Sequence, residues 1–357
     1  MDFTILQSDL AKSCATVARA LPSKPSLPIL SGIKISLSGG KLTFLASNLE
    51  LAIECSVGVQ SLGTSGDAVI PGKTFIEAAR SLPSGQIDVR YQDNLLELRY
   101  GKSSIKFNCF TSDEFPIIPD LEGERLILDG EKFGQLIRRV LPAVATDAAR
   151  PVFTGVLLTC DGNILTAVGT DTHRLAVGTM EVTGKEFSAI IPAKALAEAE
   201  RLFSGNVQMV VEANQVKFST DELSIISRLI EGKFPDTRQV MPKDFKTQIV
   251  MGRGFLLDTL SRAAVVAKNN GPVLLEVTSD TLTVSAQAEN GKIVESLDVN
   301  CTGENVKMAF NPRYLVDAIK AVDGDEVNLE IVGELQPVLI RGADDTYSHI
   351  VLPVRRG

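Results

Sequence analysis

The chain has 357 residues, of which 44% are apolar and 22% are charged. These proportions are typical of a globular protein, and a chain of this length suits about three domains. The formal net charge of −8, taken alone, argues against nucleic acid as a partner. The sequence contains no run of about 18 apolar residues, so we expect no membrane-spanning helix and no membrane partner.

Cysteine usage and the first residues indicate the compartment. The five cysteines are odd in number and lie far apart, which predicts reduced thiols and neither a disulfide framework nor a zinc site. The opening residues, MDFTIL, lack the basic and apolar regions of an export signal. We therefore expect a cytoplasmic protein with no metal and no cofactor.

Three proline-led segments organise the chain. They read IPGKTF (70–75), IPAKAL (191–196) and FNPRYL (310–315), and their prolines lie about 120 residues apart. Proline is favoured in the first turn of a helix, because its missing N–H would have no partner there. Each segment therefore predicts a helix start, followed closely by a basic residue, and each helix is followed by a glycine: Gly85, Gly205 and Gly324. The spacing predicts a threefold internal repeat.

Taken in chain order, hydrophobic periodicity gives each repeat the same plan. The first predicts a helix over 6–21, strands within 29–59, the Pro71 helix, a hairpin about Asp93-Asn94 and a strand from Ser104 to Cys109. The second predicts a helix over 131–145, strands within 156–177, the Pro192 helix and strands over 207–211, 215–219 and 225–230. The third predicts a helix from Phe255, strands over 273–277, 282–286 and 293–299, the Pro312 helix and strands over 327–332, 338–341 and 350–353.

This plan predicts an α+β protein in which each domain packs two helices on antiparallel sheets. The repeat limits divide the chain into domains over 1–121, 122–245 and 246–357.

Basic residues concentrate on the six predicted helices, whereas much of the acid lies in loops and strands. A polar outer face is ordinary for a single amphipathic helix. Six such helices in an acidic chain favour a second interpretation, in which they share one basic surface that binds phosphates. Binding of that kind is independent of base sequence and weakens with salt.

Catalytic motifs are absent from the sequence. It has no G-x-G-x-x-G, P-loop or G-x-S-x-G, and neither His173 nor His349 has metal ligands at a suitable spacing. Asp171 near His173 leaves open an α+β enzyme that uses both in a cleft, although polar residues at a strand edge are the more ordinary explanation. A third possibility is an adaptor that binds peptides but not DNA.

Four motifs carry a resemblance that covers the whole chain. They are KPSLPIL (24–30), TDTHRLAV (170–177), EGKFPD (231–236) and VLPVR (351–355). With the threefold repeat, they make the chain resemble the bacterial DNA polymerase III beta subunit, the sliding clamp. The resemblance implies three repeated DNA-clamp domains, a ring-shaped head-to-tail homodimer and a non-catalytic processivity function. The partners it implies are double-stranded DNA, the DNA polymerase III alpha subunit, the clamp loader, and other polymerases and repair proteins with clamp-binding peptides.

The resemblance also assigns residues to three sites. For DNA it implies Lys24, Lys73, Arg150, Lys194, Lys268 and Arg313. For a peptide-binding pocket between the second and third domains it implies Phe153, Thr170, Thr172, His173, Arg174, Leu175, Pro235, Val240, Asn311, Tyr314, Val338, Ile350, Leu352, Pro353, Val354 and Arg355. For the dimer interface it implies Ile105, Phe107, Val265 and Val266.

Three residues depart from the family pattern around the pocket. Thr172 stands where glycine is common, Phe153 where the family has an aliphatic residue, and Pro337 where a small polar residue is usual. We expect these changes to reshape the pocket without removing it.

Overall fold

The computed structural model describes residues 1–63, 65–147, 149–242, 244–267, 271–289 and 291–354. Lys268 and Arg355, both predicted site residues, lie outside this set. The chain divides into two compact units. One contains residues 1–130 and 201–229, and the other contains residues 131–200 and 230–357. We refer to them as unit 1 and unit 2.

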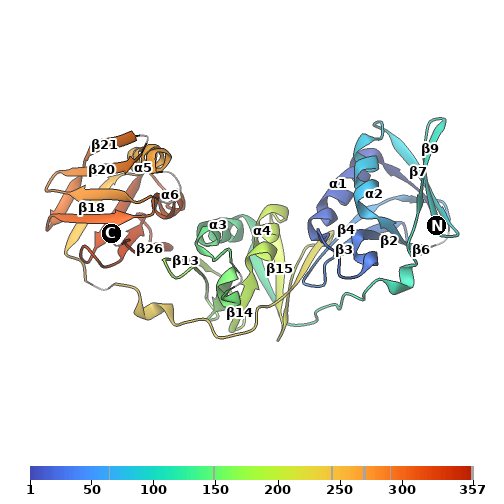
Figure 1. Cartoon of the computed structure of the whole chain (residues 1–357). Coiled ribbons are helices and arrows are strands. Elements are labelled where there is room, and N and C mark those ends of the chain that lie inside the picture. Colours follow the sequence, from blue (N-terminus) through green and yellow to red (C-terminus); the bar gives the residue numbers. More distant parts are fainter. Residues whose placement is uncertain (64, 148, 243, 268–270, 290, 355–357) are drawn as a thin grey trace. The chain divides into compact units, whose positions relative to one another are not determined.

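Unit 1 contains the helices α1 (Gln7–Val17) and α2 (Gly72–Ser81) and two antiparallel sheets (Figure 1). The five-stranded sheet has the order β5 (Gln60–Ser61), β1 (Asp2–Leu6), β7 (Gln86–Gln92), β8 (Leu95–Tyr100) and β9 (Ser103–Asn108). The eight-stranded sheet has the order β10 (Arg125–Asp129), β15 (Asn206–Val211), β16 (Gln215–Ser219), β17 (Leu223–Arg228), β4 (Leu51–Gly58), β3 (Lys41–Ser47), β2 (Gly32–Ser38) and β6 (Gly66–Pro71).

Unit 2 contains nearly all of α3 (Gly130–Val140) and α4 (Ala193–Leu202), together with α5 (Arg253–Ala267) and α6 (Pro312–Lys320). Its nine-stranded sheet has the order β14 (Phe187–Pro192), β11 (Gly155–Cys160), β12 (Ile164–Thr170), β13 (Arg174–Glu181), β26 (Tyr347–Val351), β25 (Val338–Arg341), β24 (Glu326–Ile331), β18 (Thr247–Gly252) and β22 (Asn300–Gly303). Its four-stranded sheet has the order β21 (Gly291–Asp298), β20 (Thr281–Ala288), β19 (Val273–Val277) and β23 (Val306–Phe310).

The predicted repeat is confirmed by a hydrogen bond that recurs three times. The first helix of each repeat begins where a backbone N–H donates to the carbonyl just before a later strand: Gln7 N to Gly85 O at 2.8 Å, Gly130 N to Gly205 O at 2.6 Å, and Arg253 N to Asp325 O at 2.7 Å. The glycines Gly85, Gly205 and Gly324 all have positive φ. Glycine adopts this conformation without the steric penalty of a side chain.

The predicted proline starts are correct for one helix and wrong by a residue for two. α6 begins at Pro312, and the Asn311 side chain caps it by accepting from Arg313 N. Pro71 and Pro192 instead end the strands β6 and β14, and their helices begin at the following residue. Both strands lie at a sheet edge, where a residue without an N–H is tolerated.

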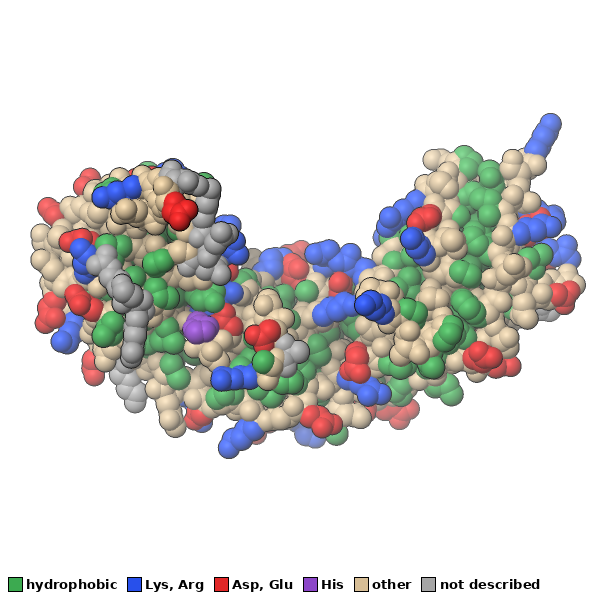
Figure 2. Space-filling view, in the orientation of Figure 1, with side chains coloured by type: hydrophobic (Ala, Val, Ile, Leu, Met, Phe, Trp, Pro, Cys, Tyr) green, Lys and Arg blue, Asp and Glu red, His purple; other side chains and the backbone are tan. Residues whose placement is uncertain are grey.

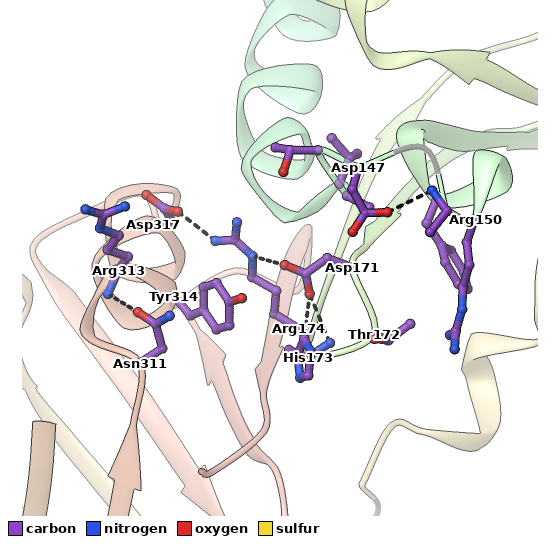
Figure 3. Close-up of a pocket in the computed structure, with 15 residues that line it drawn as sticks. Asp147, Arg150, Asp171, Thr172, His173, Arg174, Asn311, Arg313, Tyr314 and Asp317 are labelled. Atoms are coloured by element: carbon purple, nitrogen blue, oxygen red, sulfur yellow. Dashed lines mark hydrogen bonds and ion pairs between the residues drawn. The ribbon is translucent and has the colours of Figure 1, made fainter. Parts of the chain in front are cut away.

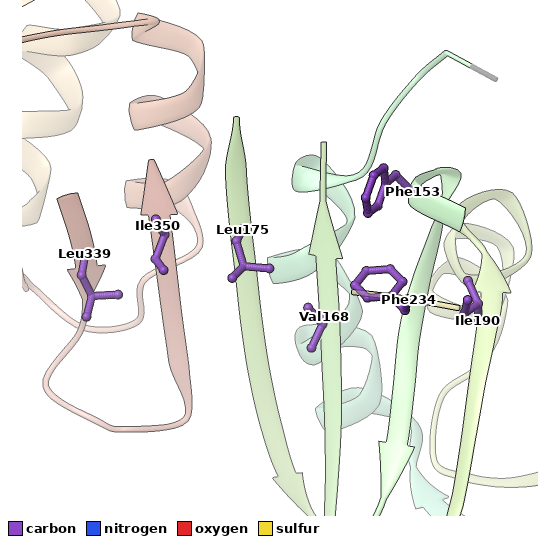
Figure 4. Close-up of a cluster of buried hydrophobic side chains, with 7 residues drawn as sticks. All are labelled: Phe153, Val168, Leu175, Ile190, Phe234, Leu339 and Ile350. Carbon is purple, nitrogen blue, oxygen red and sulfur yellow. The ribbon is translucent and has the colours of Figure 1, made fainter. Parts of the chain in front are cut away.

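The two faces of the nine-stranded sheet are covered differently. A side chain at Gly178 would meet Leu136 of α3, so Gly178 faces that helix, and alternation along β13 puts Leu175 on the other face. There Leu175 joins a buried cluster with Phe153, Val168, Ile190, Phe234, Leu339 and Ile350 (Figure 4). The Phe153 and Phe234 rings meet edge to face at 5.8 Å, an arrangement that aromatic pairs favour.

Among the described helices, none is long and apolar enough to cross a membrane.

Candidate functional site

The TDTHR motif forms the turn between β12 and β13. Asp171 Oδ1 accepts from the backbone N–H groups of His173 (2.9 Å) and Arg174 (3.0 Å), and Thr172 N donates to Thr170 Oγ1 at 3.1 Å. The Thr170 hydroxyl in turn donates to Arg174 O at 2.6 Å. Aspartate and threonine side chains stabilise turns in this way. Thr172 has φ +76°, which explains why glycine suits this position.

Arg174 is held on three sides (Figure 3). Its Nε donates to Asp171 Oδ2 at 3.0 Å, its Nη1 donates to Asp317 Oδ2 at 2.6 Å, and its guanidinium lies 4.3 Å from the centre of the Tyr314 ring. Only 11% of the Arg174 side chain is exposed. Asp317 and Tyr314 lie on α6, whereas Arg174 begins β13. The arginine therefore ties this turn to α6 by charge-assisted hydrogen bonds and a cation–π contact.

A cavity of about 680 Å³ opens beside this arginine. Figure 3 shows the side chains that surround it, which come from the TDTHR turn, the 144–153 segment and the start of α6. His173 stacks on Tyr314, with ring centres 6.5 Å apart. The volume of the cavity is in the range of small-molecule sites. The described lining residues that are polar or aromatic are Thr146, Asp147, Arg150, Phe153, Asp171, Thr172, His173, Arg174, Asn311, Arg313, Tyr314 and Asp317.

The C-terminal segment is anchored next to the same turn. Leu352 N donates to His173 O at 2.9 Å, and Val354 N donates to Ala309 O at 2.8 Å. Leu352 and Pro353 are partly buried and Val354 is more exposed. The backbone bonds thus fix an apolar tail between the TDTHR turn and β23.

The structure gathers six of the predicted pocket residues around the cavity: Phe153, Thr172, His173, Arg174, Asn311 and Tyr314. Leu175 and Ile350 lie in the buried cluster, and Thr170 supports the turn from a buried position. Pro235 and Val240 are exposed on the segment that leads to β18. These two do not line the cavity.

Val338 lies on the opposite face of the sheet from the predicted pocket residues Leu175 and Ile350. Leu339 pairs with Ile350, and Ile350 pairs with Leu175, so these three share a face of the sheet. Val338 therefore points to the opposite face, where it lines a small internal space with Leu315 and Leu329. Leu339 takes the place that the sequence analysis gave to Val338.

The proposed enzyme dyad is not supported by the geometry. Asp171 Oδ1 is occupied by two backbone N–H groups, and its Oδ2 by Arg174, so this carboxylate acts as a turn cap. The other histidine, His349, is fully buried against Tyr347. No group of three or more His, Cys, Asp or Glu side chains suited to a metal occurs in the part of the chain that the structure describes.

The predicted DNA contacts are exposed basic residues on several elements. Lys73, Lys194 and Arg313 lie in the first turns of α2, α4 and α6, and Lys24 and Arg150 lie in the loops before two short 3₁₀ turns, Pro28–Ser31 and Pro151–Thr154. Other basic residues on the helices form ion pairs within the chain: Arg138 pairs with Glu200, Arg139 with Asp323, and Arg262 with Glu295. Figure 2 accordingly shows acidic side chains among the basic ones near α3 and α4.

The residues predicted for the dimer interface differ in how exposed their side chains are. β9 forms an edge of the five-stranded sheet, yet Phe107 is buried against Phe75 of α2 at a ring distance of 5.5 Å. Ile105 and Val266 are partly buried, whereas the Val265 residue is 73% exposed on α5. Phe107 can therefore contribute its backbone edge but not its ring.

Sequence reasoning did not assign Asp317 or Leu339 to the site. Asp317 is separated from Arg174 by 143 positions, and no local pattern signals a pair at that distance. Leu339 lies in a run of three buried residues. Such a run carries no alternation to separate the two faces.

Comparison with known proteins covers nearly the whole chain. Models of the N-terminal, central and C-terminal domains of the DNA polymerase III beta subunit match residues 1–119, 127–236 and 238–355. The beta sliding clamp of Bacillus subtilis is 30% identical over 99% of this chain and its own full length, and that of Staphylococcus aureus is 29% identical over 99% of each.

Solved structures agree with this match. The B. subtilis DNA polymerase sliding clamp has a TM-score of 0.96 at 30% identity, with both chains fully covered. A Pseudomonas aeruginosa sliding clamp bound to griselimycin has a TM-score of 0.95 at 26% identity, again with full coverage. The three repeats, their six described helices and the antiparallel sheets are therefore those of the DNA polymerase III beta subunit family, to which this chain belongs.

Proposed function

We propose that the chain is a sliding clamp, a non-catalytic processivity factor that encircles duplex DNA and tethers DNA polymerase III and other factors to it. The observation that carries this proposal is the cavity beside Arg174, which the TDTHR turn, the residues around Arg150 and the start of α6 line. The C-terminal segment, which the family resemblance also assigns to partner binding, is hydrogen-bonded to the same turn. We propose further that the protein works in the cytoplasm, where its DNA lies.

We use the term groove for the cavity beside Arg174 together with Leu352 and Pro353, and we propose that this groove binds extended peptides of partner proteins. The cavity beside Arg174 offers polar groups. Leu352 and Pro353 add apolar side chains beside the TDTHR turn, to which Leu352 N is hydrogen-bonded. Extended peptides are recognised by backbone hydrogen bonds and by pockets for apolar anchors. The griselimycin complex of the P. aeruginosa clamp supports a ligand site in a protein of the same fold. The partners proposed are the polymerase alpha subunit, the clamp loader, and other polymerases and repair proteins.

Ring closure is proposed to need two chains. A head-to-tail contact closes a ring when its rotation permits, and two chains would supply six domains. The edge strand β9 and the exposed Val265 of α5 are the proposed sources of this contact. We place the domain limits near 121 and 245, in the segments between β9 and β10 and between β17 and β18.

DNA binding is proposed to rest on Lys24, Lys73, Arg150, Lys194 and Arg313, with Lys268 assigned by resemblance alone. Exposed bases bind phosphates without reading sequence, which suits a clamp that slides.

The groove is tested by a double substitution, Leu352→Ala with Pro353→Ala. It removes apolar side chains but keeps the backbone N–H of Leu352 that donates to His173 O. We expect binding of a polymerase-derived peptide, followed by fluorescence anisotropy, to fall to background. Light scattering should still give twice 38.3 kDa. Unchanged peptide affinity would remove this groove from the proposal.

A further inference from the structure

The TDTHR turn has a structural copy in unit 1. Between β3 and β4, Leu49 N donates to Ser47 Oγ at 3.1 Å, and Asn48 Oδ1 accepts from Glu50 N (3.0 Å) and Leu51 N (2.8 Å). These three bonds match those that Thr170 Oγ1 and Asp171 Oδ1 accept from backbone N–H groups in unit 2. Leu49 has φ +74°, close to the +76° of Thr172.

The strands beyond the two turns also correspond. Arg228 N donates to Glu50 O at 2.9 Å, as Leu352 N donates to His173 O at 2.9 Å. Ala52 of β4 pairs with Ile226 of β17, as Leu175 of β13 pairs with Ile350 of β26. The same backbone frame, a turn beside the junction of two neighbouring repeats, is therefore built twice in the chain.

The side chains beside the two turns differ in polarity and size. In unit 2, Leu175, Leu339 and Ile350 continue the apolar cluster across the junction. In unit 1, the corresponding residues are Ala52, Lys217 and Ile226, because Lys217 pairs with Ile226 as Leu339 pairs with Ile350. A cavity of about 260 Å³ is left at this place, and Leu45, Ala52, Glu54, Ser224, Ile226, Lys217 and the segment Ile118–Asp120 line it.

The cavity holds a lysine whose partner comes from a connecting segment. Lys217 is only 20% exposed at its side chain and pairs with Asp120, which is 75% exposed. The hydrogen bond from Lys217 holds the pKa of the Asp120 carboxyl below its ordinary value. Burial raises the pKa of Glu54, and the charges of Lys217 and Lys41 oppose this rise. Among the described residues that line the cavity, Lys217 is the one base, and Asp120 and Glu54 are the two carboxylates.

We propose that this cavity is a second docking site, for an extended partner peptide that pairs an apolar side chain with a carboxylate. The apolar side chain packs on Leu45 and Ile226, and the carboxylate replaces Asp120 at Lys217. The chain supplies its own template for this ligand, because Ile118-Pro119-Asp120 is an apolar–acidic segment that already lines the cavity. The volume lies below the range of cofactor and drug sites and suits one or two side chains.

The site does not depend on the groove of unit 2. Every residue that lines it belongs to unit 1, and its charge differs from that of the apolar cluster. A clamp with both sites would hold an apolar peptide at one and an acidic peptide at the other.

The test uses the full-length protein and a fluorescein-labelled peptide with the sequence of residues 117–121, Ile-Ile-Pro-Asp-Leu. A tethered competitor acts at an effective concentration in the millimolar range, so Asp120→Asn should strengthen peptide binding, measured by fluorescence anisotropy, at least roughly fivefold. Adding Lys217→Met to Asp120→Asn should return binding to background. A peptide in which asparagine replaces the aspartate should bind neither to the Asp120→Asn variant nor to the double variant.

The matched control is Glu304→Gln, which removes an exposed carboxylate paired with Lys246 and should leave binding unchanged. Thermal melts confirm that each variant is folded. Equal binding by wild type, Asp120→Asn and the double variant overturns the proposal, as does absence of binding to folded Asp120→Asn. Arg174→Ala should leave this peptide bound. Loss of binding there would put the peptide in the groove of unit 2 and overturn the second site.

Discussion

Thr172 occupies a position with a positive φ, which favours glycine. A β-branched residue at φ +76° pays a steric cost of about 1–2 kcal/mol, partly offset because glycine loses more entropy on folding. Thr172→Gly should therefore raise the free energy of unfolding by up to about 1 kcal/mol. Urea unfolding measures the change.

The control for this prediction is Thr172→Ala, which keeps a side chain at the same positive φ and should bring no gain. A loss of stability in Thr172→Gly would show that the threonine hydroxyl or methyl group contributes more than the strain costs.

Arg174 supports the site through three contacts at once. Its replacement by alanine leaves Asp171 and the partly exposed Asp317 without their cation, so we expect a loss of about 2 kcal/mol in the free energy of unfolding. Peptide binding at the groove should weaken as Tyr314 loses its cation–π partner. The control is Arg238→Ala, which breaks an exposed pair with Asp236 and should change neither quantity. Equal effects of the two substitutions would contradict the assigned role of Arg174.

His349 gives the protein a specific sensitivity to acid. Burial, and to a smaller extent the charge of Arg174, lowers the pKa of His349 to about 3. Below the ordinary histidine pKa of about 6.5, the unfolded chain gains a proton at this residue while the folded chain does not. Stability is therefore lost as the pH falls from about 6.5 towards 3. This residue alone should lower the free energy of unfolding by about 2 kcal/mol between pH 8 and pH 5.

The comparison that isolates His349 is the variant His349→Gln, which keeps a polar group beside Tyr347. Its unfolding free energy should fall less over the same pH range, by the amount assigned to the histidine. Parallel curves for wild type and variant would refute this assignment.

At the scale of elements, the strongly periodic segments could be predicted and the strands that lead into helices could not. The strands 215–219, 273–277 and 338–341 match the structure at both ends, because polar, glycine or proline residues flank each of these apolar segments. β6 and β14 were missed, since each continues into a helix without an intervening turn. The proline at each boundary, Pro71 or Pro192, predicts a helix start and gives no sign of the strand that it ends.

The candidate site was predicted where a local motif defines it and missed where it depends on distant partners. The TDTHR turn is a local structure, so its residues could be assigned from the motif. The role of Asp317 depends on Arg174, and the commitment of Arg139 depends on Asp323. Those pairs become visible only when the sheets bring the repeats together.

α5 offers a direct test of the proposed dimer contact. Val265 and Phe255 are each 73% exposed on this helix, but only Val265 is assigned to the interface. Val265→Glu should convert the two-chain mass to the one-chain mass in light scattering, because a carboxylate at an apolar contact is costly to bury. Phe255→Glu should leave the mass unchanged. If neither substitution dissociates the dimer, the contact lies elsewhere.

For the whole molecule, charge distribution matters more than net charge. An acidic chain can bind DNA if its exposed helix bases act together, and each lost phosphate contact should reduce the salt dependence of binding by about 0.9 in slope. Lys73→Ala, Lys194→Ala and Arg313→Ala combined should lower that slope by about 3 per chain. A control triple with Lys185, Lys233 and Arg238 replaced by alanine should leave it unchanged. Equal slopes for the two triples would exclude the helix starts as the DNA surface.

The central claim, that the protein is held on DNA by encircling it, is tested most directly by topology. The protein is loaded by a clamp loader onto nicked circular duplex DNA, isolated by gel filtration, and the DNA is then cut once by a restriction enzyme. The account predicts that the protein stays with the circle at high salt and leaves once the DNA is linear. Loss from the intact circle at the same rate, or retention after cutting, would contradict it.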